Sequence, residues 1–164
     1  MPGTPESGDQ SKPLTALGFD FGVKYIGVAI GQTLTGSARA LKIFRARDGQ
    51  PDWQALIAYI EQWQADVLIV GLPLNMDGTE SEFCRRARKF ARRLREHSRK
   101  PVQMFDERLS TRTAKLETRA SGPTNTPGKG LQASVDAQAA RLILESWLSQ
   151  PEFATSPDGK SNQR

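Results

Sequence analysis

The first part of the chain alternates between apolar positions and small or polar ones, which is the pattern of β-strands. Residues 14–21, 25–30 and 38–45 each read as a strand, and only short connections separate them. Because short connections favour antiparallel neighbours, these three segments predict an antiparallel meander.

Helical spacing replaces this alternation after the third strand. Apolar residues recur at helical intervals over residues 53–63, and Pro51 suits the first turn of that helix. The run Val67–Val70 is apolar at every position and predicts a strand buried on both faces. Thr79 and Glu82 form a capping-box pair, which predicts the start of a long helix.

The remaining segments complete an α/β pattern. Residues 102–105 predict a fifth strand, and Ser134 is expected to cap the last helix. A meander followed by alternating helices and strands predicts three layers, in which helices cover both faces of a five-stranded mixed sheet. Residues 1–13 and 151–164 are rich in Pro, Gly, Ser and charged residues, so we expect disordered tails around one domain at residues 14–150.

Composition narrows the classes of partner. The 164 residues carry a net charge of +5, which fits either a solvated basic surface or a polyanionic partner such as nucleic acid. Cys84 is the only cysteine, so no disulfide can form within the chain. No apolar run in the sequence is long enough to cross a bilayer, so we expect no membrane partner and a cytoplasmic location.

Three acidic residues fall where a ligand site is expected. Asp20 lies at the C-terminal end of the first strand, within an otherwise apolar and glycine-rich stretch, and Gly18 and Gly22 on its face are expected to leave room for an ion. Glu107 follows the fifth strand, and Asp136 lies in the first turn of the predicted last helix. In α/β sheets, ligands collect outside the carboxyl ends of the strands.

Three carboxylates at one edge would repel one another unless a cation held them. Oxygen ligands without a His–Cys cluster favour Mg²⁺ or Mn²⁺, and such a site can cleave a phosphodiester. Taken separately, Asp20 would be a turn residue, Glu107 a loop acid and Asp136 an acid favoured by the helix dipole. This separate interpretation is weakest for Asp20, because a lone carboxylate in an apolar strand is costly.

Basic residues are concentrated in the predicted long helix. Residues 85–100 contain nine Lys and Arg residues but only one acid, Glu96, so this face could bind a phosphate backbone or serve only as a solubilising surface. Other candidates flank the acids or lie in the loop before the long helix. The candidate nucleic-acid-binding residues from these observations are Asn75, Arg85, Arg86, Arg108, Arg112 and Lys129.

Four motifs, GFDFGVKYIGVAIG, VGLPLNMDGTE, DERLST and SVDAQAARLILES, together resemble the YqgF/RuvX family, whose members are described as Holliday junction resolvases or pre-16S rRNA nucleases. The resemblance covers residues 14–148. It implies a ribonuclease H-like fold and a metal-dependent phosphodiesterase site whose acids fall on Asp20, Glu107 and Asp136. The family commonly has Arg where this chain has Lys24, which keeps a phosphate-contacting charge but loses bidentate geometry.

The leading hypothesis is a Mg²⁺- or Mn²⁺-dependent endonuclease that cleaves structured nucleic acid. The resemblance favours processing of the 5′ end of pre-16S rRNA, in ribosome biogenesis, over cleavage of branched DNA at Holliday junctions. Two other classes stay open. An ATP-binding protein of the actin or sugar-kinase kind also has Asp-x-Gly in its first hairpin, but it needs two lobes. A non-catalytic nucleic-acid-binding factor would keep the basic surface without cleavage.

Overall fold

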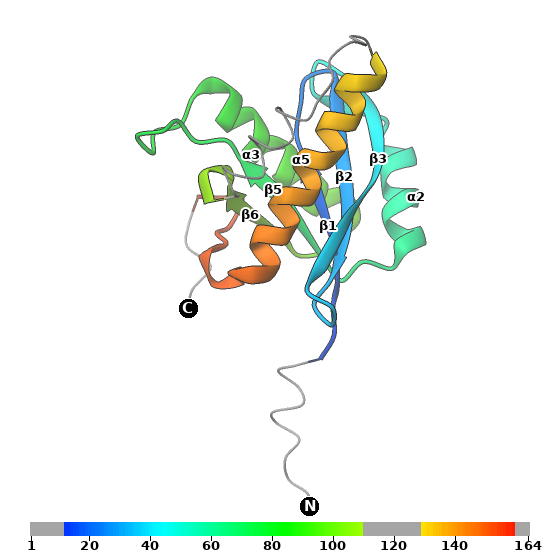
Figure 1. The fold of residues 1–164 in the computed structure, drawn as a ribbon. Helices are drawn as coiled ribbons and strands as arrows, with labels where there is room; N and C mark the ends of the chain where they lie inside the picture. The colour runs from blue at the N-terminus through cyan, green and yellow to red at the C-terminus, as the bar shows by residue number, and fades with distance from the viewer. Residues whose placement is uncertain (1–11, 110–128, 160–164) are drawn as a thin grey trace, which may run out of the picture.

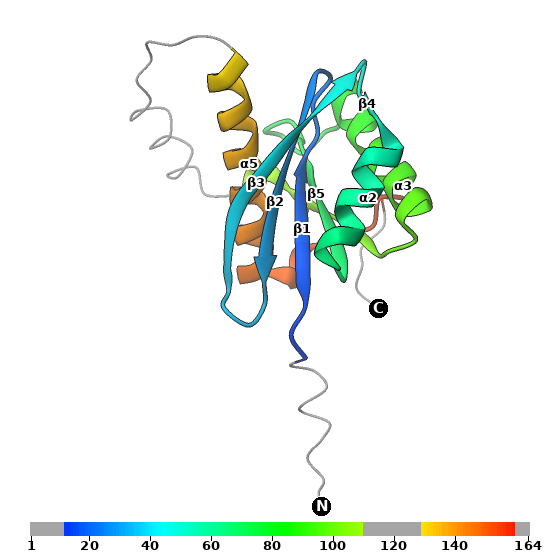
Figure 2. The same cartoon turned by 90° about the vertical axis from the view of Figure 1, so that its right-hand side faces the viewer.

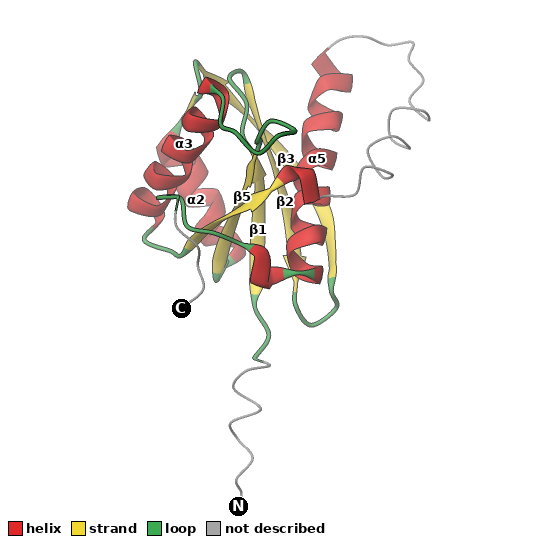
Figure 3. Ribbon diagram, turned by 90° about the vertical axis from the view of Figure 1, so that its left-hand side faces the viewer, coloured by secondary structure: helices red, strands yellow, loops and turns green. Residues whose placement is uncertain are grey.

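The computed structural model describes residues 12–109 and 129–159, with side chains described outside 129–136. The strands are β1 (Thr15–Asp20), β2 (Tyr25–Gln32), β3 (Ser37–Arg47), β4 (Gln50–Pro51), β5 (Val67–Leu72) and β6 (Val102–Asp106). The helices are α2 (Trp53–Trp63), α3 (Glu82–Ser98) and α5 (Lys129–Ser149), with two 3-10 turns, η1 (Glu107–Leu109) and η2 (Pro151–Phe153). They form three layers, with α5 on one face of the sheet and α2 and α3 on the other (Figure 1, Figure 2, Figure 3).

The sheet is mixed, with the order β4-β3-β2-β1-β5-β6. Strands β1 to β4 pair antiparallel as a meander, while β5 pairs parallel with both β1 and β6. The α/β class and the mixed sheet are therefore confirmed. None of the helices in the described part of the chain combines the length and the apolar character that crossing a bilayer requires.

The sheet has one strand more than the five expected, because the two residues of β4 are too few to show alternation. The chain turns back at Asp48 and Gly49, so that Gln50 and Pro51 pair with the end of β3. Pro51 is therefore a strand residue and not part of the helix. Asp52 caps α2 instead, since its Oδ1 accepts a hydrogen bond from the backbone N–H of Ala55 at 3.2 Å.

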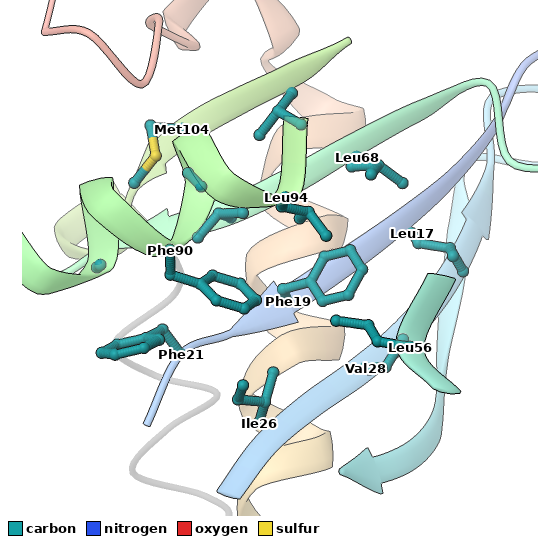
Figure 4. Packing of buried hydrophobic residues seen from close by; sticks show 14 of the residues in the cluster. Leu17, Phe19, Phe21, Ile26, Val28, Leu56, Leu68, Phe90, Leu94 and Met104 are labelled. Carbon is teal, nitrogen blue, oxygen red and sulfur yellow. The ribbon is translucent and has the colours of Figure 1, made fainter. Parts of the chain in front are cut away.

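The larger part of the core lies between the sheet and the helices α2 and α3. Leu17 and Phe19 of β1 are fully buried on this face, and Phe90 and Leu94 of α3 pack against them (Figure 4). The rings of Phe19 and Phe90 lie 6.2 Å apart between centroids. Because α3 is apolar on this side only, burying the stripe fixes which way its charged side faces.

The opposite face packs closely against α5, and small residues make this possible. A Cβ added at Gly18 would lie 3.0 Å from Leu144 Cβ and 3.2 Å from the carbonyl oxygen of Ala140. The space beside Gly18 is thus filled by the helix, and the expectation that it leaves room for an ion is wrong. Gly22 has a different role, because a Cβ there would clash with the carbonyl of Tyr25 in the turn to β2.

The chain after α5 folds back along the sheet edge instead of beginning a tail at residue 151. The 3-10 turn η2 leads to Ala154, which is buried, and to Thr155, which forms an antiparallel bridge with Met104 of β6. The two backbone hydrogen bonds of this bridge measure 2.8 and 2.9 Å. Burial of Ala154 and this pairing account for the difference from the disorder expected over residues 151–159.

Candidate active site

Asp20 occupies the last position of β1, on the face that α5 covers. Ala16, four residues earlier on the same face, is buried in one cluster with Ala140 of α5. In the parallel register Phe19 pairs with Val70, so the next residues, Asp20 and Gly71, lie side by side. Asp20 is half-buried and stands at the carboxyl end of β1, beside the parallel strand β5.

Glu107 follows the end of β6, and its side chain reaches over Gly71. A Cβ at position 71 would lie 2.6 Å from Glu107 Oε2 and 2.5 Å from Ile143 Cδ1 of α5. The carboxylate of Glu107 therefore lies over the end of β5, on the face that α5 covers. Since neighbouring strands are about 5 Å apart, the fold brings Asp20 and Glu107 to adjacent positions at one edge of the sheet.

Asp136 lies further inside the last helix than the sequence predicted. The helix begins at Lys129 and not at Ser134, so Asp136 lies about two turns from its start. Gly130, a poor helix former, is accommodated within the helix. The side chain of Asp136 is outside the described part of the structure.

The course of α5 nevertheless places the backbone of Asp136. Ala140 lies over Gly18, while Leu148 lies near Gly31 at the far end of the sheet. The helix thus runs antiparallel to β1, and Asp136, one turn before Ala140, lies toward the end of β1 that carries Asp20.

Asp20 and Glu107 offer only carboxylate oxygens, which suits a hard divalent cation such as Mg²⁺ or Mn²⁺. Among the described side chains there is no group of three His, Cys, Asp or Glu residues that could hold a metal ion. Asp20 and Glu107 are therefore suited to be two of the ligands of such a cation. The third ligand predicted from the sequence, Asp136, belongs to the segment whose side chains are not described.

Asp106 points to the opposite face from Glu107. It shares the face of Val102 and Met104, which belong to the core beneath α3. Its carboxylate pairs with Arg108, whose Nη2 lies 2.7 Å from Asp106 Oδ2. Arg108 Nη1 also donates to the carbonyl oxygen of Met76 at 3.1 Å. The Asp106 carboxylate raises the pKa of Arg108. Through its contacts with Asp106 and Met76, Arg108 connects the end of β6 to the loop before α3.

The loop between β5 and α3 is held together by its own hydrogen bonds. Asn75 Nδ2 donates to Thr79 Oγ1 at 2.9 Å, and Thr79 Oγ1 donates to Asp77 Oδ1 at 2.6 Å. The bonds from Thr79 lower the pKa of Asp77. The helix begins at Glu82, and Ser81, not Thr79, is its cap. Asn75 and Thr79 thus stabilise a loop at the same end of the sheet as the acids.

The structure describes the three remaining candidate nucleic-acid-binding residues to different extents. Lys24 is exposed in the turn from β1 to β2, at the end of the sheet where Asp20 lies. Lys129 is the first residue of α5, and its side chain is outside the described part. Arg112 lies outside the described residues altogether.

Three arginines of α3 have acidic partners outside the helix. Arg86 pairs with Asp48, Arg88 with Glu80, and Arg95 with Asp158. Arg85 pairs within the helix with Glu82, and both side chains are largely exposed. The near absence of acids within residues 85–100 is therefore partly offset by tertiary contacts.

Sequence analysis missed these partner acids because no local signal marks them. Asp48 comes from a turn, Glu80 from the preceding loop and Asp158 from the segment after η2. These contacts also show which cations of α3 lack an acidic partner. Among the described residues, Lys89, Arg92 and Arg93 have no acidic group within ion-pair distance.

The mixed sheet with one helix on the acid-bearing face and two on the other defines a ribonuclease H-like α/β protein. The family model described as "RuvX: Holliday junction resolvase" matches residues 14–150, and this chain belongs to the RuvX family. The fold and the family resemblance expected from the sequence are both confirmed.

Curated relatives agree with this assignment. A protein of Chromohalobacter salexigens is 54% identical over 137 residues, covering 84% of this chain and 90% of the relative. A protein of Saccharophagus degradans is 52% identical over 136 residues, covering 83% and 94% respectively. Both are named "Putative pre-16S rRNA nuclease".

Solved structures support the fold. The structure titled "T. thermophilus RuvC in complex with Holliday junction substrate" matches 84% of this chain and 96% of that chain, with a TM-score of 0.53 and 13% identity. A second structure of Thermus thermophilus RuvC matches with a TM-score of 0.50 and 12% identity. At this identity the likeness concerns the fold alone.

Proposed function

We propose that this protein is a divalent-metal-dependent endonuclease that hydrolyses phosphodiester bonds in structured nucleic acid. The observation that carries the proposal is the position of Glu107 over Gly71, beside Asp20, at the carboxyl ends of the parallel strands. Carboxylates that converge at this edge of an α/β sheet are typical of ligand and metal sites.

Asp20 and Glu107, with Asp136 as the third acid, would hold Mg²⁺ or Mn²⁺. When bound, the cation supplies Lewis acidity and lowers the pKa of a nearby water. Ile143 of α5 lies over Gly71 as the Glu107 carboxylate does, so α5 covers this side of the pair. The substrate would therefore approach from beyond the strand ends, where the exposed Lys24 can bind a phosphate oxygen.

The proposed substrate is the 5′ end of pre-16S rRNA, in ribosome biogenesis. The names of relatives that are 52% and 54% identical support this choice, as does the net charge of +5. Such a role would place the protein in the bacterial cytoplasm. The description of the family favours a second candidate, the Holliday junction, in which DNA recombination would supply the substrate.

A cleavage assay tests the proposal. The full chain is incubated with an RNA spanning the 5′ end of 16S rRNA and its precursor extension, and with a four-way DNA junction. Each substrate is offered with Mg²⁺, with Mn²⁺ and with a chelator. We expect metal-dependent cleavage of the RNA, and a loss of at least about 100-fold in rate for Asp20→Asn and Glu107→Gln.

Asp52→Asn is the matched control, because it removes one carboxylate outside the site and Asn caps a helix as well as Asp. It should cleave at the wild-type rate. Cleavage by Asp20→Asn at that rate would refute the proposed site. Cleavage of the junction but not the RNA would establish the second candidate, and binding without cleavage of either would leave a non-catalytic factor.

A further inference from the structure

A groove of about 620 Å³ lies between α3 and the turn that joins β3 to β4. The turn forms one wall and is held in place by Arg86, whose Nη2 donates to the carbonyl oxygen and to Oδ1 of Asp48 at 2.8 and 2.9 Å. Gly49 has a φ of +81°, and a Cβ there would lie only 3.0 Å from Phe21 Cζ. The wall is therefore tightly packed. We call this feature the α3 groove.

Aromatic side chains form the floor of the α3 groove. The ring centroids of Phe21 and Phe90 lie 5.3 Å apart, and Trp53 stacks on Phe90 at 5.6 Å. Figure 4 shows Phe21 and Phe90 side by side where β1 meets α3. Trp53 Nε1 also donates to Gln50 Oε1 at 3.2 Å, which ties the floor to the wall. The groove thus has a preformed shape.

The charge that lines the α3 groove is positive. Five cations line it against two acids, Asp48 and Glu82, and both acids are already paired with arginines. The three other cations, Lys89, Arg92 and Arg93, have no acidic partner among the described residues.

The hydrogen bonds of Arg92 and Arg93 are with neutral groups, although the charge of Arg92 also acts on Asp158. Arg92 Nη1 donates to the carbonyl oxygen of Pro157 at 3.3 Å, and Arg93 Nη1 donates to Gln50 Oε1 at 3.0 Å. Lys89 is exposed. A hydrogen bond to a neutral acceptor leaves the positive charge of Arg93 uncompensated, so Arg93 and the exposed Lys89 attract an anion with several charges to the groove.

The α3 groove opens at the same end of the sheet as the acid pair. Phe21 of the groove floor directly follows Asp20, and strand alternation sends these two side chains to opposite faces. A polyanion that lies in the groove is therefore near the end of β1 that carries Asp20, on the opposite face of the sheet.

We propose that the α3 groove binds the phosphodiester backbone of the nucleic acid that is cleaved at Asp20 and Glu107, with Lys89 and Arg93 in contact with its phosphates. The substrate would then contact both faces of the sheet at the carboxyl end of β1. This inference rests on the proposed function for the identity of the polyanion.

Fluorescence anisotropy of labelled RNA with the full chain, in a chelator so that nothing is cut, tests the groove separately from cleavage. The variant Lys89→Gln/Arg93→Gln removes two charges from the groove. The control Arg99→Asn/Lys100→Gln removes two charges from the other end of α3, and Asn tolerates the left-handed backbone of Arg99. We expect the groove variant to raise the Kd at least about tenfold above the control, with a smaller salt dependence.

Thermal unfolding verifies that each variant folds, and Lys89→Arg/Arg93→Lys should restore binding because the charge returns. Unpaired RNA, an RNA hairpin and inorganic phosphate as a competitor distinguish a single strand, a duplex and free phosphate as the source of the anion. Equal Kd values for the groove variant and the control would overturn the inference, even if the protein cleaves RNA. Groove-dependent binding without any cleavage would uphold it while refuting the nuclease.

Discussion

The carboxylate of Glu107 lies directly over the backbone of Gly71, so that a Cβ at position 71 would come within 2.6 Å of Glu107 Oε2. Glycine at this position is thus what allows the acid that follows β6 to lie beside the acid that ends β1. Ile143 of α5 also lies over Gly71, so the helix and the strand both limit the space around the Glu107 carboxylate.

Gly71→Ala should therefore displace Glu107 and reduce cleavage by at least about tenfold, with a stability loss of about 1–3 kcal/mol from overpacking. Urea denaturation and the RNA cleavage assay measure the two effects. Gly31→Ala is the control, because its Cβ would crowd Leu144 and Leu148 of the same helix at the far end of the sheet. It should lose stability but keep its cleavage rate. Full activity of Gly71→Ala would contradict the packing of Glu107.

Divalent cations should stabilise the folded protein through Asp20. A ligand at ten times its Kd adds about 1.4 kcal/mol, which raises the Tm of a chain of this size by about 3–5 °C. Thermal unfolding with Mn²⁺ or with a chelator should show this shift for the wild type and for Asp52→Asn, and not for Asp20→Asn. An equal shift in all three proteins would place the cation elsewhere.

The Glu80–Arg88 pair should make stability depend on acid pH. Its side chains are 33% and 14% exposed, and the hydrogen bond from Arg88 holds the pKa of Glu80 below its ordinary value of 4.5. A carboxyl whose pKa is lower in the folded state stabilises the fold above its unfolded pKa, and this stabilisation is lost as the pH falls through the folded pKa.

Glu80→Gln should therefore lower the free energy of unfolding by about 1–2 kcal/mol at pH 7. The difference from the wild type should shrink below about pH 4.5 and vanish in stronger acid. Denaturant titrations across this range measure it. Glu82→Gln breaks only the exposed pair with Arg85 and should cost less. A loss for Glu80→Gln that stays constant from pH 7 to pH 3 would exclude the ionised pair as its cause.

The thiol of Cys84 should be inert in the folded protein. The residue is fully buried in the core beneath α3, and this burial raises its pKa. Alkylation at pH 8 should be slower by at least about 100-fold than in guanidinium, where one thiol per chain reacts. Rapid labelling of the native chain would show that the first turn of α3 opens readily.

Local patterns were sufficient to predict most of the elements and the face of β1 that carries Asp20. The alternation around Asp20 and the helical spacing of apolar residues in α3 depend on neighbours a few positions away, and the structure keeps both. Boundaries were less well predicted. Ser81 caps α3 instead of Thr79, because Thr79 is already engaged with Asn75 and Asp77 in the loop.

The sequence by itself determined the order of the strands and helices other than β4, their buried faces and the carboxyl-end position of Asp20, because period and composition act over a few residues. Only the tertiary structure decided that Glu107 lies over Gly71, that α5 fills the space beside Gly18, and which cations of α3 have acidic partners. Those outcomes depend on contacts between different segments of the chain, most of them tens of residues apart. No local pattern records such contacts, since they exist only once the sheet and its helices have packed.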